Sequence, residues 1–447
     1  MDGFKVIDGG KNPKHNQDNN PGRSDNPTLF DALDGEKPVD ELDADTIPSW
    51  LSATPTPAAP SQEPQLSAQE RRWAWAEIDL EAIKHNLKAI RKRIGPGIKI
   101  MAVVKDEGYG HGAVPVAKAA LNNGASFLGV STVDEGIALR RAGITAPVII
   151  LAEPPIASIP AILHYQLIPA IDTMEFALAL GEESSAQNKV TPFHLKVDTG
   201  MNRLGVHHSD AGDFLRTISF HSGLELQGVF THFATADEQD TYEFKLQLDR
   251  FNSALETIRY MGINPGIVHA ANSAAAIRYK VASFNMVRIG IALYGLHPCE
   301  LTRGVIDLHP AMSVHARVSY VKPVSVGEGV SYNLTYRSPG SVRIATVPIG
   351  YGDGLSRVLS NRMDVLVKGR LCPQVGNICM DMCMFEINMR SSGRVPRIDV
   401  EIGDEVLIIG RDGDTELTID NMARTLGTNT YDICCRFGLR LEKVYSE

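Results

Sequence analysis

The sequence predicts an α/β protein: a (β/α)8 TIM-type barrel followed by a mostly antiparallel β domain, with a disordered N-terminal tail. Between residues 98 and 289, short apolar strand patterns alternate with amphipathic helix patterns in about eight units, as a parallel barrel requires. After Pro310, alternating strand patterns separated by Gly and Pro indicate a β domain with few helices. Residues 1–70 are rich in Asn, Asp, Pro, Ser and Gly, a composition typical of disorder.

We therefore expect a disordered extension at residues 1–71, a barrel domain at 72–309 and a β domain at 310–447. Order should begin near Trp73, because Trp75–Leu80 alternates like a strand. This first strand is a candidate member of the β domain as well as of the barrel domain. The segment that follows, Glu81–Ile94, carries apolar side chains at helical spacing and is stopped by Gly95-Pro96-Gly97.

The remaining elements follow from periodicity and from Gly and Pro punctuation. The expected barrel strands are 98–104, 126–130, 147–151, 167–171, 193–197, 224–230, 267–269 and 286–289. The expected helices between them are 114–121, 132–142, 157–164, 174–180, 211–220, 243–261 and 273–280. In the β domain we expect strands within 314–320, 342–349, 364–367 and 405–409, and a helix at 419–426. An open doubly wound sheet is the alternative, but no Gly-x-Gly-x-x-Gly follows the first strand.

Composition narrows the class of partner. The formal net charge of -9 disfavours nucleic acid and anionic membranes, which bind basic surfaces. No apolar run is long enough to span a membrane and the first 20 residues are polar, so we expect a cytoplasmic protein. The six cysteines, from Cys299 onward, match no zinc-binding spacing, and we expect reduced thiols and no metal site.

The stretch Ile98–Gly112 is the first candidate for chemistry. Its apolar half, Ile100–Val104, is typical of a strand buried on both faces, and Lys105 stands at the strand's C-terminal end. A Gly-rich turn with Tyr109 and His111 follows. Such a lysine is most often a surface charge, but apolar walls could lower its pKa and prepare it for Schiff-base chemistry.

Other polar residues also follow barrel strands, where the active sites of this fold are built. They are Lys196, Asp198 and Arg203 after the fifth strand, Thr231, His232 and Thr235 after the sixth, His269, Asn272 and Ser273 after the seventh, and Arg288, Gly290 and Ile291 at the eighth. Surface cations, core histidines and a helix N-cap at Asn272 are the ordinary interpretations. However, the loops after strands seven and eight form the recurring phosphate site of such barrels. A lysine, a phosphate site and several cations in one mouth fit pyridoxal 5'-phosphate.

Taken together, these segments resemble the alanine racemase family from about Trp75 to the C-terminus. The matching segments are Ala102-Val103-Val104-Lys105, Tyr109-Gly110-His111-Gly112, Asp198-Thr199-Gly200-Met201, Arg203-Leu204-Gly205, Thr231-His232-Phe233-Ala234, Asn272-Ser273, Arg288 with Gly290, Gly329-Val330-Ser331-Tyr332, Ile349-Gly350-Tyr351-Gly352-Asp353-Gly354 and Cys379-Met380-Asp381. The resemblance implies a racemase that uses pyridoxal phosphate, interconverts L- and D-alanine and supplies D-alanine for peptidoglycan. It also implies a homodimer with shared active sites.

The resemblance further implies roles for single residues. Lys105 would carry the cofactor, and Lys105 and Tyr332 would be the two acid/base groups, with Tyr332 reaching in from the partner subunit. Inversion at Cα needs a proton removed from one face and one returned to the other, hence two groups. Arg203 and Met380 would bind substrate, and Arg288 would face the pyridine nitrogen. The other implied residues are Tyr109, His232, Asn272, Ser273, Gly290, Ile291 and Tyr431 at the cofactor, with Lys196, His269, Tyr351 and Asp381 behind them.

The sequence also departs from the family pattern. Asp106-Glu107-Gly108 replaces the usual Ala-Asp/Asn-Ala after the lysine, and Asn377 stands where many members have Arg, although Arg357 keeps a matching position. The carbamylation that many members show at the position of Lys196 cannot be read from sequence. Because of the departures at 106–108 and Asn377, serine or a broader range of amino acids is the alternative substrate. A non-catalytic pyridoxal phosphate-binding protein is an alternative from another class, but such barrels lack the β domain.

Overall fold

The computed structural model describes residues 67–387, 398–438 and 440–446. They belong to one compact unit, Leu66–Glu447. Most of the predicted disordered tail lies outside the described residues. The prediction is wrong for its last residues, because Ala68–Arg71 form helix α2. The Ser67 hydroxyl donates to Glu70, and Arg71 pairs with Glu442 at 2.9 Å, so local capping and a distant ion pair stabilise this turn.

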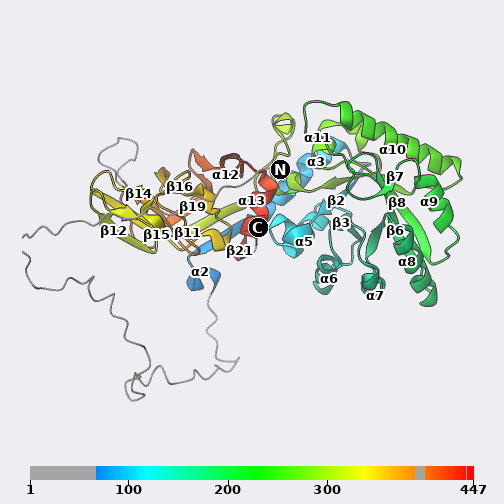
Figure 1. Ribbon diagram of the computed structural model, residues 1–447, viewed down its shortest axis with the longest axis horizontal. Helices are drawn as coiled ribbons and strands as arrows, with labels where there is room; N and C mark the ends of the chain where they lie inside the picture. The colour runs from blue at the N-terminus through cyan, green and yellow to red at the C-terminus, as the bar shows by residue number, and fades with distance from the viewer. Residues whose placement is uncertain (1–66, 388–397, 439, 447) are drawn as a thin grey trace, which may run out of the picture. The chain divides into compact units, whose positions relative to one another are not determined.

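A closed barrel of parallel strands forms the larger part of the described chain (Figure 1), which confirms the predicted fold. Its eight strands in the described residues are β2 (Lys99–Val103), β3 (Phe127–Val130), β4 (Val148–Ile150), β5 (Ile168–Ile171), β6 (Thr191–Asp198), β8 (Leu224–Phe230), β9 (Ile267–His269) and β10 (Met286–Ile289). Pairing of β2 with β10 and of β5 with β6 closes the ring. A short strand, β7 (Val206–His207), adds to β6 and was not predicted.

Apolar side chains on both faces explain why these strands pack centrally. Met101, Phe127, Ile149, Ile168 and Met286, from five strands, form a buried cluster separate from the main core, and we infer that they fill the barrel interior. The alternate residues of the same strands belong to the main core, together with the helices. This two-sided burial is the reason that the strands read as continuous apolar runs in the sequence.

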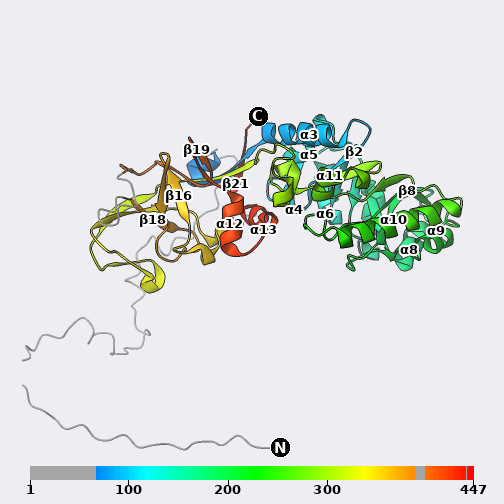
Figure 2. The ribbon, with the colours of Figure 1, turned by 90° about the horizontal axis from the view of Figure 1, so that it is seen from above.

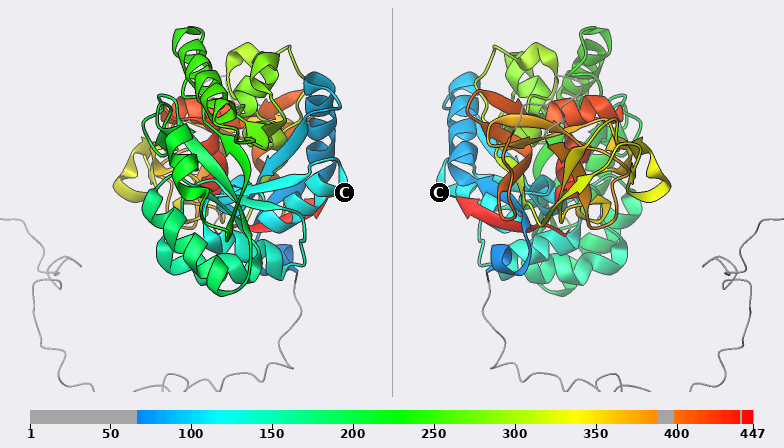
Figure 3. Two further views of the ribbon diagram at one scale, coloured as in Figure 1. Left: turned by 90° about the vertical axis from the view of Figure 1, so that its right-hand side faces the viewer. Right: turned by 90° about the vertical axis from the view of Figure 1, so that its left-hand side faces the viewer.

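Helices surround the strands, as Figure 3 shows from two sides. They are α3 (Leu80–Ile94), α5 (Ala113–Asn122), α6 (Val133–Arg141), α7 (Ile159–Tyr165), α8 (Met174–Ala186), α9 (Ala211–Ile218), α10 (Tyr242–Tyr260) and α11 (Ser273–Arg278). Asp79, Thr132 and Thr173 cap α3, α6 and α8 with side-chain oxygens that accept backbone N–H groups. None of the helices in the described ranges combines the length and the apolar character that a membrane span requires.

The C-terminal part is mostly antiparallel β-structure. Its largest sheet has the order β17-β16-β19-β11-β1-β21, with β20 added to β19. The strands are β1 (Ala74–Asp79), β11 (Met312–Arg317), β16 (Asp364–Val367), β17 (Arg370–Pro373), β19 (Glu405–Asp412), β20 (Thr415–Leu417) and β21 (Glu442–Ser446). Strand β1 runs antiparallel to β11 and parallel to β21, so the first strand pairs in this sheet and not in the barrel.

Two smaller sheets and two α-helices also belong to this part, and Figure 2 labels the helices α12 and α13. The sheets contain β12 (Tyr320–Val324), β15 (Val342–Val347) and β18 (Cys383–Ile387), and β13 (Gly329–Val330) with β14 (Tyr336–Arg337). The helices are α12 (Ile419–Leu426), at its predicted bounds, and α13 (Thr430–Phe437). All six cysteines are free thiols, as expected.

The barrel and the β domain meet at the turn after β2. Residues 106–110 all have positive φ, so segment α4 (Lys105–Tyr109) turns left-handed after the lysine. Gly110, with φ of 80°, packs so closely on α13 that a Cβ there would lie 2.3 Å from the Cys434 carbonyl oxygen. Only glycine fits this approach, which fixes the turn against α13.

Substitution of Gly110 should therefore lower the free energy of unfolding by more than the backbone strain of a positive φ alone would. Gly143 has a φ of 81° and open space around it, so Gly143→Ala is a matched control. We expect Gly143→Ala to destabilise the protein by about 1 kcal/mol and Gly110→Ala by roughly 3 kcal/mol or more. Thermal unfolding of both variants measures the difference, and equal melting temperatures would show that the α13 contact is dispensable.

Candidate active site

A cavity of about 770 Å³ opens at the C-terminal ends of the barrel strands. Eleven of the residues singled out from the sequence line it: Lys105, Tyr109, Lys196, Arg203, His232, Asn272, Ser273, Arg288, Gly290, Ile291 and Tyr431. Four of these are lysines or arginines, while the carboxylates of the lining are Asp106 and Glu135. The cavity is thus suited to a ligand with negative charge.

The end of β2 and the turn after it position Lys105. The Val104 N–H donates to the Gly129 carbonyl at 2.9 Å, so the strand pairing extends to the residue before the lysine. One residue beyond the lysine, the Asp106 N–H donates to Glu135 Oε1 at 2.5 Å. Lys105 is therefore held from both sides through the backbone.

Glu135 is a functional residue that the sequence reasoning missed. Its Oε2 accepts the N–H groups of Ser131 and Thr132 at 2.7 and 3.1 Å, while Oε1 reaches Asp106. Thr132 and Glu135 form the capping box of α6. The Thr-x-x-Glu spacing predicts the N-terminus of a helix, but it does not predict that Glu135 also contacts the turn at Asp106.

Arg288 is buried in the wall of the cavity and is held by five hydrogen bonds. Nη1 donates to His269 Nδ1 and to the His269 carbonyl, both at 3.1 Å. Nη2 donates to His232 Nδ1 at 2.9 Å and to the carbonyls of Thr231 and Ala270 at 2.8 and 3.0 Å. All five contacts use the terminal nitrogens. Burial lowers the pKa of Arg288 to about 9, which still leaves it charged at neutral pH.

The guanidinium fixes the protonation of its histidine neighbours because it can only donate. His269 Nδ1 must accept, so its proton is on Nε2, which donates to His194 Nδ1 at 2.8 Å. His194 Nε2 then donates to Gln227 Oε1 at 3.2 Å. Burial and the positive charge of Arg288 lower the pKa values of His194, His232 and His269, that of His194 to about 4. Neither His194 nor Gln227 was singled out from the sequence.

A polar cradle lies at the loops after β9 and β10, where a phosphate site was predicted. Ser273 Oγ accepts the N–H groups of Gly290 and Ala292 at 3.1 and 3.4 Å, and Asn272 caps α11. A Cβ on Gly290 would lie 2.6 Å from the Tyr109 hydroxyl, so the glycine makes room for that tyrosine. Burial raises the pKa of Tyr109 and Tyr431, and both hydroxyls therefore stay protonated donors.

A second group of charges lies beside β6. Lys196 Nζ donates to the Leu151 carbonyl at 3.1 Å and lies 5.7 Å from the centre of the Phe230 ring. Burial, together with Arg203, Arg288 and Lys105, lowers its pKa to about 8. Burial and the neighbouring Glu153 raise the pKa of Asp172 to about 7. Glu153 accepts three hydrogen bonds from Asp172 and Thr173, so we assign the negative charge of the pair to Glu153.

Five of the expected site residues do not line this cavity. His269 lies behind Arg288, whereas Tyr332, Tyr351, Met380 and Asp381 belong to the β domain. Tyr332 is 70% exposed, and Met380 and Tyr351 are 53% and 42% exposed. Asp381 pairs with Arg440. Within one chain, the structure does not bring the phenol of Tyr332 to the lysine.

Fold and cavity together define a two-domain barrel enzyme with a lysine in a cation-lined mouth. Two family models match the chain in succession, the alanine racemase N-terminal domain at residues 78–298 and the alanine racemase C-terminal domain at 311–445. The chain belongs to the alanine racemase family, as its motifs predicted, and its enzyme class is that of the isomerases.

Individual relatives agree with this assignment. An alanine racemase of Symbiobacterium thermophilum is 42% identical over 84% of this chain and 97% of its own length. The structure of a Clostridium difficile alanine racemase has a TM-score of 0.79 at 34% identity, covering 84% and 96% of the two chains. A histidine racemase of Leuconostoc mesenteroides has a TM-score of 0.76 at 28% identity, covering 84% and 98%.

The raised pKa of Asp172 predicts that the stability of the protein depends on pH. Its pKa is raised on folding, so the stability that it contributes is present below its ordinary pKa near 4 and is lost as the pH rises through about 7. Asp172→Asn cannot ionise, so the melting temperature of the variant minus that of wild type should increase from pH 5 to pH 8.5. We expect an increase of roughly 2 °C or more, kept small by the partial exposure of the carboxyl.

The matched control for this prediction is Asp414→Asn, because Asp414 is an exposed loop aspartate. Its melting temperature difference should stay constant over the same pH range. A constant difference for Asp172→Asn as well would contradict the assignment of a raised pKa.

Proposed function

We propose that this protein interconverts L-alanine and D-alanine with pyridoxal phosphate bound at Lys105. The observation that carries the proposal is the cavity at the barrel mouth. It brings the single lysine at the end of β2 together with Arg203, Arg288 and a polar cradle. Such a set can hold a phosphate, a ring nitrogen and a carboxylate at the same time.

The residues of the cavity fit the cofactor. The Ser273 hydroxyl and the hydroxyls of Tyr109 and Tyr431, whose pKa values are raised, suit a phosphate, with Gly290, Ile291 and Asn272 beside them. In the described chain, the contacts of Arg288 occupy Nη1 and Nη2, so Nε is the donor left for a ring nitrogen. When bound, pyridoxal phosphate would withdraw electrons from Cα and make its proton acidic.

The proton transfers would fall to two side chains on opposite faces of the substrate. Lys105 would remove or return the Cα proton on one face, and Tyr332 would do so on the other. Arg203 would bind the substrate carboxylate, and its charge would favour the phenolate form of Tyr332. A charged Arg288 at the ring nitrogen would keep that nitrogen unprotonated, which limits the electron withdrawal and hence side reactions.

Tyr332 would come from the partner subunit of a homodimer. Its side chain is exposed, as are those of Leu334 and Met380 in the same domain. Its backbone is nevertheless fixed, because Asn377 Nδ2 donates to the Tyr332 carbonyl at 2.8 Å. An exposed tyrosine on a backbone held by this hydrogen bond supports a role in another copy of the chain. Met380 would line the substrate site, with Tyr351 and Asp381 behind it.

Lys196 and His269 would act indirectly. His269 holds Arg288, and Lys196 shares the wall of the cavity with Arg203. A pKa near 8 leaves part of Lys196 as the neutral amine that carbamylation requires, which supports that modification here. A location in the cytoplasm and a role in peptidoglycan synthesis stay predictions.

A broader substrate range is the second candidate. It is favoured by Asn377, because an amide replaces the arginine of many family members next to the exposed tyrosine. The similarity to a histidine racemase shows that this fold accepts a larger side chain in that protein. Turnover on alanine, serine and histidine, measured with one preparation, separates the two candidates.

Lys105→Ala tests the central assignment. The variant should lose the visible absorbance of the bound cofactor together with racemisation, because both require the same amine. Absorbance spectra and a chiral assay on alanine measure the two effects. Lys99→Ala, which changes an exposed lysine at the start of the same strand, should keep both. A Lys105→Ala variant with wild-type turnover would refute the proposal.

Tyr332→Phe tests the shared site. The variant should bind cofactor but lose orders of magnitude in rate, because a proton donor is removed with little change in volume. If Tyr332 acts in the partner's site, unfolding and refolding a mixture of Lys105→Ala and Tyr332→Phe chains should restore activity. Random pairing gives each mixed dimer one complete site, hence about one quarter of wild-type activity.

The control is a mixture of Lys105→Ala with the doubly substituted chain, in which no complete site can form. It should stay inactive. Failure of the first mixture to regain activity, with mixed dimers demonstrated by mass, would place Tyr332 in the site of its own chain or outside the reaction.

A further inference from the structure

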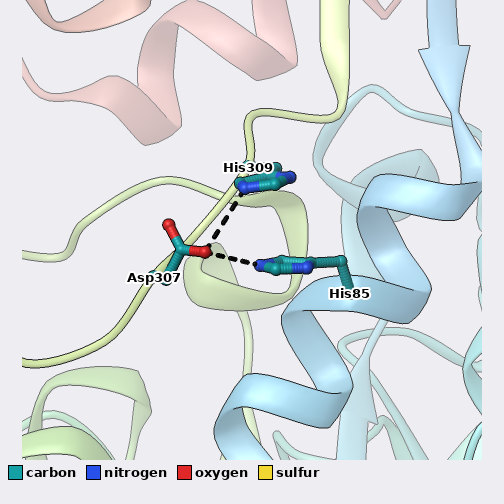
Figure 4. A group of neighbouring side chains, drawn as sticks. All are labelled: His85, Asp307 and His309. Carbon is teal, nitrogen blue, oxygen red and sulfur yellow. Dashed lines mark ion pairs between the residues drawn. The ribbon is translucent and has the colours of Figure 1, made fainter.

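Two histidines and an aspartate converge on the outside of the barrel, away from the cavity (Figure 4). His85 lies on α3, and Asp307 and His309 lie in the segment that leads into β11. Both Nε2 atoms face the same oxygen, Asp307 Oδ2, at 3.1 Å from His85 and 3.4 Å from His309. One ligand atom of each residue lies within 4.8 Å of the other two.

The two distances from the histidine nitrogens to Asp307 Oδ2 are close to those between metal ligands. Ligands about 2.0–2.1 Å from a zinc ion in a tetrahedral site stand roughly 3.3 Å from one another. His85 Nε2 is buried and, among the described residues, has no hydrogen-bond partner, although Asp307 Oδ2 is 3.1 Å away. The nitrogen and oxygen are thus close without the geometry of a direct hydrogen bond, which a shared ion would explain.

The chain holds two of the three residues in place. Asn86, next to His85 on α3, is fully buried. Its Nδ2 donates to the His309 carbonyl at 2.9 Å, and its Oδ1 accepts the His309 N–H at 2.8 Å. The side chains of His85 and His309 therefore start from backbones that are fixed to each other, as preorganised metal ligands should.

The histidine rings are stacked, with centroids 3.8 Å apart and planes 8° from parallel. Parallel rings cannot both point a lone pair at one ion, so one ring must tilt on binding. The His309 side chain is 55% exposed and has room to turn.

We propose that His85, Asp307 and His309 form a binding site for a divalent transition metal, with Zn²⁺ as the ligand that imidazole and carboxylate suit best. Ca²⁺ and Mg²⁺ are disfavoured because they prefer oxygen ligands. Water completes the coordination, because the three side chains supply three ligands. The ion joins α3 to the segment before β11, the strand that pairs with β1 immediately ahead of α3.

Binding of ZnCl₂ to the full-length holoenzyme without an affinity tag tests the proposal. After treatment with a chelator and gel filtration, calorimetric titration should show about one Zn²⁺ per chain at this site. His309→Ala and Asp307→Asn should each weaken binding by roughly tenfold or more. Both side chains are exposed, so the variants should keep their wild-type circular dichroism spectrum and their turnover.

The control is His164→Ala, since His164 is an exposed histidine on α7. It should bind Zn²⁺ as wild type does. Zn²⁺ should also raise the melting temperature of wild type and of His164→Ala, but not of His309→Ala, because an ion that binds only the folded chain stabilises it.

Co²⁺ in place of Zn²⁺ distinguishes this site from the free thiols at Cys299, Cys379 and Cys435, which are only partly buried. Nitrogen and oxygen ligands should give visible d–d bands without the intense near-ultraviolet band of a cobalt thiolate. The proposal fails if wild type binds no metal, if His85→Ala and His309→Ala bind as wild type does, or if the Co²⁺ spectrum shows thiolate ligands only.

Discussion

The position of Lys105 depends on a left-handed turn that the sequence after it must be forced to adopt. Residues with side chains avoid positive φ, and here Asp106, Glu107 and Tyr109 have it in close succession. Each such residue costs of order 1 kcal/mol, so the surroundings must hold the turn. Glu135 does so at the Asp106 amide, and α13 does so at Gly110. Because α13 also carries Tyr431, the same contact sets the lysine and one wall of the cavity.

Arg288 imposes the second constraint, because it sets the direction of the hydrogen bonds around it. A buried guanidinium offers only donors, so each histidine that touches it must present an acceptor. The chain from Arg288 through His269 and His194 to Gln227 then has one consistent arrangement of protons. The buried imidazoles stay neutral, since a further positive charge beside Arg288 would be unfavourable. The charge at the back of the cavity therefore belongs to Arg288.

Much of the barrel could be predicted from the sequence because its strands are buried on both faces. Their apolar runs stand out, and the expected ranges agree with the observed strands to within about two residues, as for Leu224–Phe230. Most cavity residues could also be placed, because polar side chains at the ends of parallel strands must meet at one mouth. Tyr431 was assigned through the resemblance to the family instead, since it lies on α13 and not at the end of a barrel strand.

The residues that sequence reasoning missed share one property, which is that their partners are distant along the chain. Glu135 has a local signature as a capping residue, and only the fold shows that its second oxygen reaches Asp106. His194 lies inside β6, where a lone histidine has no periodic signal, and its role follows only from contact with His269. The turn at 106–110 was recognised as Gly-rich, but its handedness depends on α13, which lies more than 300 residues away. Propensity cannot encode such contacts.

The proposed site draws on both domains, because its two acid/base groups, Lys105 and Tyr332, belong to different ones. The lysine, Arg288 and Ser273 belong to the barrel, whereas Tyr431 of α13 adds one group from the β domain to those proposed to hold the cofactor. Tyr332, Asn377 and Met380 belong to the β domain, and the exposed side chains of Tyr332 and Met380 are available to close a site in another copy. Alanine racemases and a histidine racemase share this fold with the chain, so the barrel alone does not fix which side chain is accepted. In the proposed dimer, substrate choice is set by the loops that cover the barrel mouth. In that dimer the amide of Asn377 would bear on substrate choice through its hydrogen bond to the Tyr332 carbonyl.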